Sequence, residues 1–283
     1  MKHVLLSTLF LLSGILFAQN KADSTLNKWE PSLLVSANVS QVAFENWSKG
    51  GENSLSYAFG LDWIMKYKSD SKWTFKNQLK GDWGKTQNNG DEARVTSNNI
   101  YNESVFLVDV GWTVEPYASN LIRTPITDGY NYDALPKEQI VAFFDPGYVT
   151  QSLGFAYQKS EIIQTRLGLA FEESFASKFA VKYTDDPETP NEIEDFKYET
   201  GIESITDVKW EVAENVLYTG KLRLFSAFDR FTVWDVAMDN TFTAKVNDWL
   251  HVKFSYYLIY KASETLKTQT QEALQVGVSY NIF

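Results

Sequence analysis

A two-residue periodicity runs through much of the chain and constrains its fold more than any other feature. In the segment LSYAFGLDWIMKY, residues 55–67, every second residue is large and apolar or aromatic, and the residues between are mostly small or charged. Successive side chains of a β-strand point to opposite faces, so this pattern predicts a strand with one apolar and one more polar face. About twelve such segments follow one another, without convincing helical periodicity between them.

The predicted strands differ in how clearly they show two faces. Two segments, about 98–109 and 113–123, carry apolar residues in both phases, so no outer face is assigned to them. The clearer segments lie at 33–40, 55–67, 73–84, 149–157, 163–171, 202–210, 216–224, 234–246, 250–261 and 274–282.

Short and long connections alternate between these segments. Short ones fall at 68–72, 110–112, 158–162, 212–215 and 246–249, and long ones at 45–53, 87–94, about 124–147, about 176–195, 226–232 and 263–271. Bacterial outer-membrane barrels have short periplasmic turns and longer extracellular loops. An even number of strands places both termini on the periplasmic side. The sequence therefore predicts an all-β fold, a transmembrane antiparallel up-and-down β-barrel of about twelve strands.

Aromatic residues support a membrane-spanning barrel over a soluble one. Tyr67, Trp73, Trp112, Tyr157, Trp210 and Trp249 gather near the short turns, as expected of the aromatic belt at a membrane interface. A strand of about 11 residues, tilted by about 40°, spans about 27 Å, close to the apolar band of an outer membrane. The alternative is a soluble sandwich or lipocalin-like barrel with the aromatics in its core, and alternation alone does not separate the two.

Composition excludes several classes of function. The mean hydropathy of −0.29 resembles that of a soluble protein, but barrels that alternate lipid-facing and lumen-facing residues also have low averages. A formal net charge of −10 argues against a nucleic-acid partner. The absence of cysteine excludes disulfides, zinc–thiolate sites and thiol nucleophiles.

The first residues have the parts of a secretory signal. Lys2 and His3 precede an apolar run at 4–17, and Ala18 is a small residue at a plausible cleavage point. The run of about 14 residues is shorter than the roughly 20 of a transmembrane helix, which is the alternative. We predict a signal peptide at 1–18, a short periplasmic segment at 19–30 and an outer-membrane barrel at 31–283, exported to a Gram-negative outer membrane.

The faces of the strands predict what lines the barrel. In the segment 55–67, Tyr57, Phe59, Leu61, Trp63 and Met65 are expected to face lipid. Asp62 and Lys66 on the opposite face are expected to face the lumen, because a charge on the lipid side costs roughly 2–4 kcal/mol at mid-depth. Charges pair across the lumen and narrow it, or line a polar path, depending on strand register. The charged candidates for the lumen lining are Asp62, Lys66, Lys76, Lys80, Asp82, Arg166, Glu203, Lys221, Arg223, Asp235, Asp239 and Lys245.

Catalytic and metal-binding patterns are weak. His251 is the single histidine of the mature chain, and its phase places it in the lumen near a short turn, away from the outer rim where a hydrolase site would lie. The acidic stretch at 183–195 matches no EF-hand spacing and is expected to be a solvated loop, with calcium binding as its alternative. We expect no enzymatic activity, no cofactor and no metal.

Two stretches resemble a known family. Residues 40–63 contain Asn46-Trp47, Gly50-Gly51 and Asn53-Ser54, and residues 143–157 read FFDPGYVTQSLGFAY. These resemble uncharacterised outer-membrane β-barrel proteins of the Bacteroidetes envelope, which implies the same fold and no assigned function. Gly50-Gly51 suits a tight hairpin with positive φ, and Trp47 either packs its own loop or contacts a ligand.

The chain's end also resembles an outer-membrane feature. A last strand ending in the aromatic Phe283 resembles the signal read by the barrel-assembly machinery, although Phe283 falls one position out of step with Val278, Tyr280 and Ile282. The expected partners are that machinery, membrane lipid and lipopolysaccharide.

The function expected from the sequence is passage of a small solute through the lumen. The alternative is a structural or surface-interaction barrel with a plugged lumen, whose outer loops bind a partner.

Overall fold

Twelve strands close into one antiparallel barrel in the part of the chain that the computed structural model describes, residues 26–44, 51–158, 160, 162–186, 189, 192–262 and 265–281. The first strand pairs with the last, which closes the sheet, so the predicted fold class is confirmed. The barrel strands are β1 (Trp29–Val42), β2 (Ser54–Lys68), β3 (Trp73–Asn88), β4 (Arg94–Val108), β5 (Glu115–Thr124), β8 (Gly147–Tyr157), β9 (Ile163–Phe175), β10 (Phe196–Ala213), β11 (Val216–Ala227), β12 (Asp235–Lys245), β13 (Leu250–Tyr260) and β14 (Gln269–Asn281).

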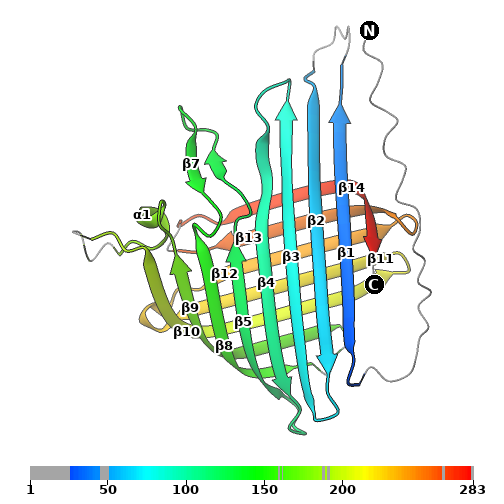
Figure 1. Ribbon diagram of the computed structural model, residues 1–283, viewed down its shortest axis with the longest axis vertical. Coiled ribbons are helices and arrows are strands. Elements are labelled where there is room, and N and C mark those ends of the chain that lie inside the picture. The colour runs from blue at the N-terminus through cyan, green and yellow to red at the C-terminus, as the bar shows by residue number, and fades with distance from the viewer. Residues whose placement is uncertain are drawn as a thin grey trace.

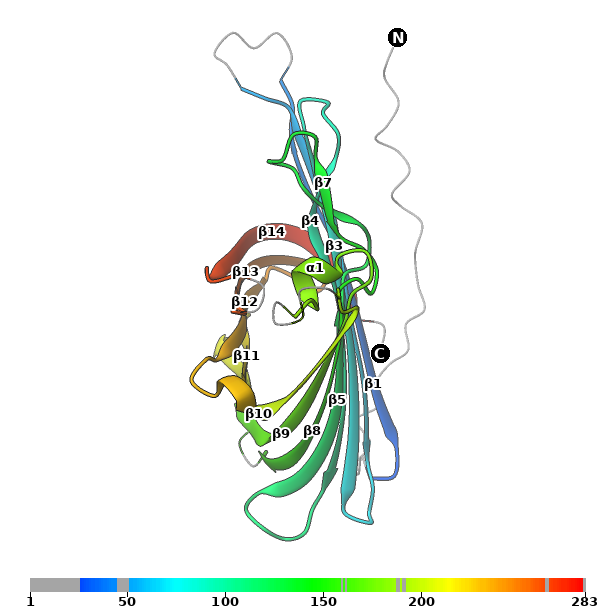
Figure 2. The ribbon, with the colours of Figure 1, turned by 90° about the vertical axis from the view of Figure 1, so that its left-hand side faces the viewer.

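The strands cross the barrel wall obliquely. In Figure 1, β1 to β4 run upright on the near wall while β10 to β13 run across the picture on the far wall. Figure 2 looks into the barrel, with α1 at its mouth. Such a tilt is required to close a sheet into a barrel.

Long connections at one end of the barrel carry the remaining elements. These are the hairpin of β6 (Gly129–Asn131) and β7 (Glu138–Val141), the single turn of helix α1 (Ala180–Tyr183) and the 3-10 turn η1 (Phe228–Arg230). The other end has the short turns between β2 and β3, β4 and β5, β8 and β9, β10 and β11, and β12 and β13. Among the described residues, no helix is long and apolar enough to cross a membrane.

The chain ends lie partly outside the described residues. β1 begins at Trp29, two residues before the predicted start of the barrel at 31. The predicted signal peptide at 1–18 and the terminal Phe283 lie outside the described residues.

The outer wall is apolar and the interior is largely polar. On β2, Phe59, Leu61 and Trp63 are exposed on one face, while Asp62 on the other face accepts a hydrogen bond from the side chain of Gln78 on β3. Fully buried interior side chains include Glu103, Glu172 and Glu203. This arrangement is the reverse of a soluble barrel, whose large apolar residues fill the centre.

The two weakly patterned segments are explained by an apolar patch inside the barrel. Val105, Leu107, Tyr117 and Ala156 form a buried interior cluster, while Phe106 lies exposed on the outside. Both faces of β4 are therefore apolar near the short turns, which is why its outer face was not assignable from the sequence.

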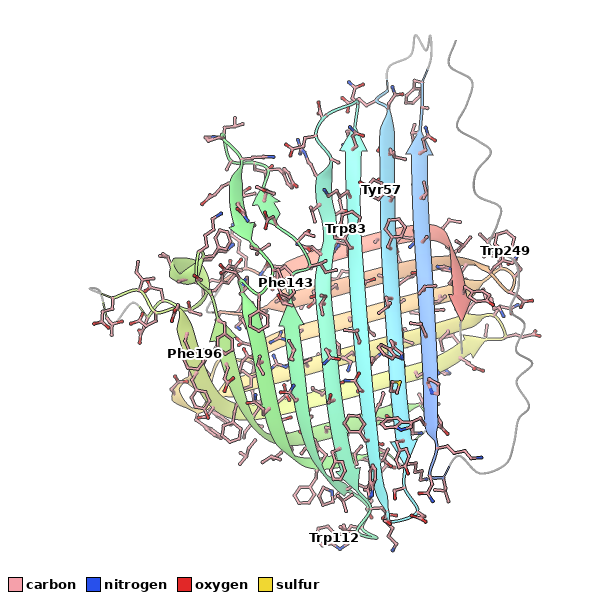
Figure 3. The ribbon with its side chains drawn as sticks, in the orientation of Figure 1. Tyr57, Trp83, Trp112, Phe143, Phe196 and Trp249 are labelled. Carbon is pink, nitrogen blue, oxygen red and sulfur yellow. The ribbon has the colours of Figure 1, made fainter. Side chains whose placement is uncertain are left out.

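Aromatic side chains form a rim at each end of the barrel, as the residues labelled in Figure 3 show. At the short-turn end, Tyr67 stacks on Trp73 with ring centroids 5.0 Å apart, and Trp73 stacks on Phe106 at 5.7 Å. At the long-loop end, Phe59 stacks on Trp83 at 6.3 Å, and the rim residue Tyr57 lies against the same ring at 6.0 Å. The rims thus follow the strand ends around the barrel.

Candidate functional site

Ion pairs join opposite walls inside the barrel. The Glu103 cluster consists of Glu103, Tyr101, Arg166, Asp207 and Lys221. Glu103 receives Arg166 Nη2 at 2.5 Å on one carboxylate oxygen and Lys221 Nζ at 3.0 Å on the other. Lys221 Nζ also lies 3.0 Å from Asp207 and donates to the hydroxyl of Tyr101 at 2.9 Å. Since β4 and β11 are five positions apart around the sheet, the Glu103–Lys221 pair crosses the lumen.

A second set of ions, the Glu172 cluster, consists of Glu172, Arg123, Glu203, Arg223 and Lys261. The side chain of Glu172 is 1% exposed and receives Arg223 at 2.7 Å, Lys261 at 2.9 Å and Arg123 at 3.1 Å. Arg223 also donates to Glu203 at 2.6 Å. Lys261 directly follows β13, four positions from β9, so this cluster also spans the interior.

Both clusters compensate buried charges with ion pairs that join different walls of the barrel. Charged groups withdrawn from water are stable only where opposite charges and hydrogen bonds replace their hydration. In both clusters, carboxylates meet guanidinium and ammonium groups at hydrogen-bonding distance, so they hold the walls together and fill this half of the lumen. A smaller group at the long-loop end pairs Arg230 with Asp235 and Glu199, each at 3.0 Å.

The other half of the lumen carries charges without such partners. Here the unpaired group consists of Asp62, Lys80, Asp82, Asp239 and Lys253. None of the five has an opposite charge within 4.0 Å among the described residues, yet Asp82 lies within electrostatic reach of the other four. β3 and β12 are five positions apart around the sheet, so these charges face one another from different walls.

This half of the interior is also more accessible. Leu34 of β1 pairs directly with Asp62 of β2, so both side chains point inward, and Leu34 is 42% exposed. Lys66 and Glu30, farther along the same two strands, form a 3.8 Å pair and are both partly exposed. The interior is therefore divided into a closed half and a more open half.

The twelve charged residues predicted for the lumen fall into distinct places. Lys76 is half-buried beside the Glu103 cluster. Lys66 and Lys245 are exposed near the short turns, where Lys245 pairs with Asp248 at 3.1 Å. The remainder are distributed as follows: Arg166 and Lys221 in the Glu103 cluster, Glu203 and Arg223 in the Glu172 cluster, Asp235 with Arg230, and Asp62, Lys80, Asp82 and Asp239 in the unpaired group.

Sequence reasoning missed the carboxylates at the centre of both clusters. Glu172 continues the inward phase of Gln164 and Arg166, so extending that phase by six residues would have found it. Glu103 was hidden because Val105 and Leu107 share its face and obscure the polarity of the strand. Lys253 shares the phase of His251 and was identifiable in the same way.

The remaining residues singled out in the sequence do not belong to the two clusters or to the unpaired group. His251 is buried, beside the short turn between β12 and β13. The described acidic residues of the loop at 183–195 do not form a group of three or more metal-ligating side chains. In the loop motif, Gly51 has a φ of +134°, as expected for a glycine turn. Asn46, Trp47 and Gly50 lie outside the described residues.

The β6–β7 hairpin is fixed against the neighbouring β3–β4 hairpin. Asn98 accepts from the backbone N–H groups of Ile126 and Thr127 at 2.9 Å and donates to the carbonyl of Thr127 at 2.7 Å. Lys137 pairs with Glu92 at 2.5 Å, and this hydrogen bond lowers the pKa of the Glu92 carboxyl. These contacts hold the β6–β7 hairpin in place beside the β3–β4 hairpin.

Comparison with known protein families matches only part of the chain. Residues 39–130, fewer than half of the chain, match a family described as "Protein of unknown function (DUF3078)". The motif at 40–63 lies inside the matched region and the motif at 143–157 lies outside it. No curated protein matches the sequence.

Solved barrels are similar at low identity. An outer membrane channel from Pseudomonas putida F1 is 10% identical, with a TM-score of 0.40 over 90% of this chain and 95% of that one. The translocator domain of the autotransporter NalP from Neisseria meningitidis is 9% identical, with a TM-score of 0.35 over 89% and 86%. The β domain of a Bordetella autotransporter, BrkA, is 8% identical, with a TM-score of 0.30 over 89% and 98%. The fold is defined by the strand pairing, which closes the sheet between β1 and β14.

Proposed function

We propose that this chain is an outer-membrane barrel that lets small polar solutes pass through the open half of its lumen. The outer wall supports the membrane location. On β2, the rim residues Tyr57 and Tyr67 are ten residues apart, or about 33 Å along the strand. At a tilt of about 40° they are separated by about 25 Å across the membrane, the height of the apolar band of outer-membrane barrels.

The observation that carries solute passage is the division of the interior. The Glu103 and Glu172 clusters satisfy their own charges and close one half. The five side chains of the unpaired group in the other half are only partly buried, whereas both central carboxylates of the closed half are buried. A polar path along β1 to β3 and β12 to β14 follows from this arrangement.

Lys221→Met is expected to widen the path. It removes the contact from β11 to Glu103 while the Glu103–Arg166 pair remains, so the walls lose one cross-lumen tie without leaving Glu103 unpaired. We expect single-channel conductance in planar bilayers to rise by about twofold, because the methionine is no longer held against Glu103 and conduction depends on pore diameter and lining groups.

Lys137→Met is the matched control for this measurement. Lys137 is an exposed loop residue outside the barrel wall, and the conductance of that variant should equal that of the unchanged protein. Absence of conductance and solute flux in the unchanged protein under several conditions would reject passage.

A structural barrel with a plugged lumen is the second candidate. The observation that favours it is the crossing of the lumen at two levels, by Glu103–Lys221 and Glu172–Lys261. In that case the fixed β6–β7 hairpin and its neighbours serve as a surface for a partner. Lack of conductance in both the unchanged protein and the Lys221→Met variant would favour this function.

The proposal includes the route to the membrane. The signal peptide at 1–18 is cleaved on export, the barrel-assembly machinery reads the C-terminal strand, and lipid and lipopolysaccharide surround the wall. The barrel belongs to the envelope type found in Bacteroidetes and has no enzymatic activity. Membrane fractionation with heat-modifiable gel migration tests the location, and recovery in the aqueous fraction without detergent would reject it.

A further inference from the structure

We infer that the permeant solutes are small zwitterions of the amino-acid type, and that the unpaired group selects them. This inference deepens the proposed function and depends on it. The group brings three carboxylates, Asp62, Asp82 and Asp239, together with the ammonium groups of Lys80 and Lys253.

Charges of both signs lie close together at one level of the lumen. Asp62 and Lys80 are direct cross-strand partners on β2 and β3, and Gly60 beside Asp62 is the partner of Asp82. A Cβ atom at position 60 would lie 3.3 Å from Asp82 Oδ1. The absence of a side chain at Gly60 therefore leaves room for the Asp82 carboxylate on the inner face of the sheet. Both signs are therefore concentrated within two or three residues of strand.

The far wall also carries both signs of charge. Asp239 of β12 is the cross-strand partner of the inward-facing Lys221, and Lys253 of β13 is the partner of Thr243, on the same face of β12 as Asp239. Both side chains therefore face the lumen from the wall opposite β3. A solute of one sign is attracted by some of these groups and repelled by others. A zwitterion places its ammonium group near carboxylates and its carboxylate near lysines, and so gains from both.

The charges of the closed half differ from the unpaired group in already having close partners. In the Glu103 and Glu172 clusters, each central carboxylate already binds two or three cations at 3.1 Å or less. Those groups have little capacity left for a solute. Asp62 accepts from Gln78 at 2.9 Å and Asp239 from Thr241 at 3.4 Å, and among the described residues neither carboxylate has a cation within 4.0 Å.

Liposome swelling with the full chain tests the inference, using glutamine as the zwitterion and arabinose as a neutral solute of similar mass. We expect glutamine to enter about tenfold faster, a ratio equivalent to about 1.4 kcal/mol. The double variant Asp82→Asn/Lys253→Met removes one charge of each sign and keeps the net charge. Because Asp62, Lys80 and Asp239 remain, its ratio should fall to about threefold, with the arabinose rate little changed.

The matched control is the double variant Asp248→Asn/Lys245→Met. It makes the same two substitutions in an exposed ion pair of a short turn, and its ratio should stay near tenfold. Heat-modifiable migration verifies that every variant is folded. Equal entry of glutamine and arabinose into liposomes with the unchanged protein overturns the inference while passage stands. An unchanged ratio in the Asp82/Lys253 variant overturns the assignment to these residues. If neither solute enters, the proposed function itself fails.

Discussion

Glu172→Gln should lower the free energy of unfolding by about 3–5 kcal/mol, because it leaves buried cations without their counter-charge. Glu172 is the meeting point of Arg123, Arg223 and Lys261, with nitrogen–oxygen distances of 2.7–3.1 Å. Glutamine has the same shape but no charge, so the loss measures electrostatic compensation and not packing. Urea unfolding in lipid or detergent, followed by tryptophan fluorescence, measures the change.

Glu92→Gln provides the comparison on the same protein. Glu92 also has a lysine partner, but the Glu92–Lys137 pair is exposed in the loops. Exposed pairs contribute little because water and salt screen them, so the urea midpoint of this variant should not move. If Glu172→Gln and Glu92→Gln unfold alike, the Glu172 cluster does not hold the barrel walls together.

The sequence predicts which side chains face the interior, but it does not predict which of them pair across it. Alternation fixes which face of a strand is polar, so the strand count and the inward placement of residues such as Arg166 follow from it. Pairing across the lumen involves strands four or five positions apart, and alternation within one strand contains nothing about that distance. The Glu103–Lys221 contact joins residues 118 positions apart in the chain, and only the closed sheet brings them together.

Some sequence predictions were incomplete for reasons that lie within a single strand. The inward face of β4 carries Glu103, Val105 and Leu107, so polarity changes along a single face. A pattern that assumes a uniformly polar lumen cannot assign such a strand. On β9 the predicted inward phase was correct, but it was not extended to the end of the strand, so Glu172 was not predicted.

Leu61→Arg should destabilise the folded barrel in lipid by about 2–4 kcal/mol, the cost of a charge on the lipid-facing wall at mid-depth. Leu61 lies on the outer face of β2, four residues from the rim residue Tyr57 and six from Tyr67, and so close to mid-depth. It is 37% exposed, so an arginine there would meet hydrocarbon if the wall spans a membrane. Unfolding in urea from lipid vesicles gives the free-energy difference.

Leu55→Arg separates a membrane from water as the surroundings of the wall. Leu55 has the same residue type, strand, face and exposed fraction as Leu61, but it lies beyond Tyr57 toward the long loops. Near the interface a charge costs only about 0–1 kcal/mol. In a barrel surrounded by water, the two substitutions would cost the same, because both side chains are equally exposed to it. The difference between them therefore measures the membrane alone, and a difference of zero would remove the basis for any path across it.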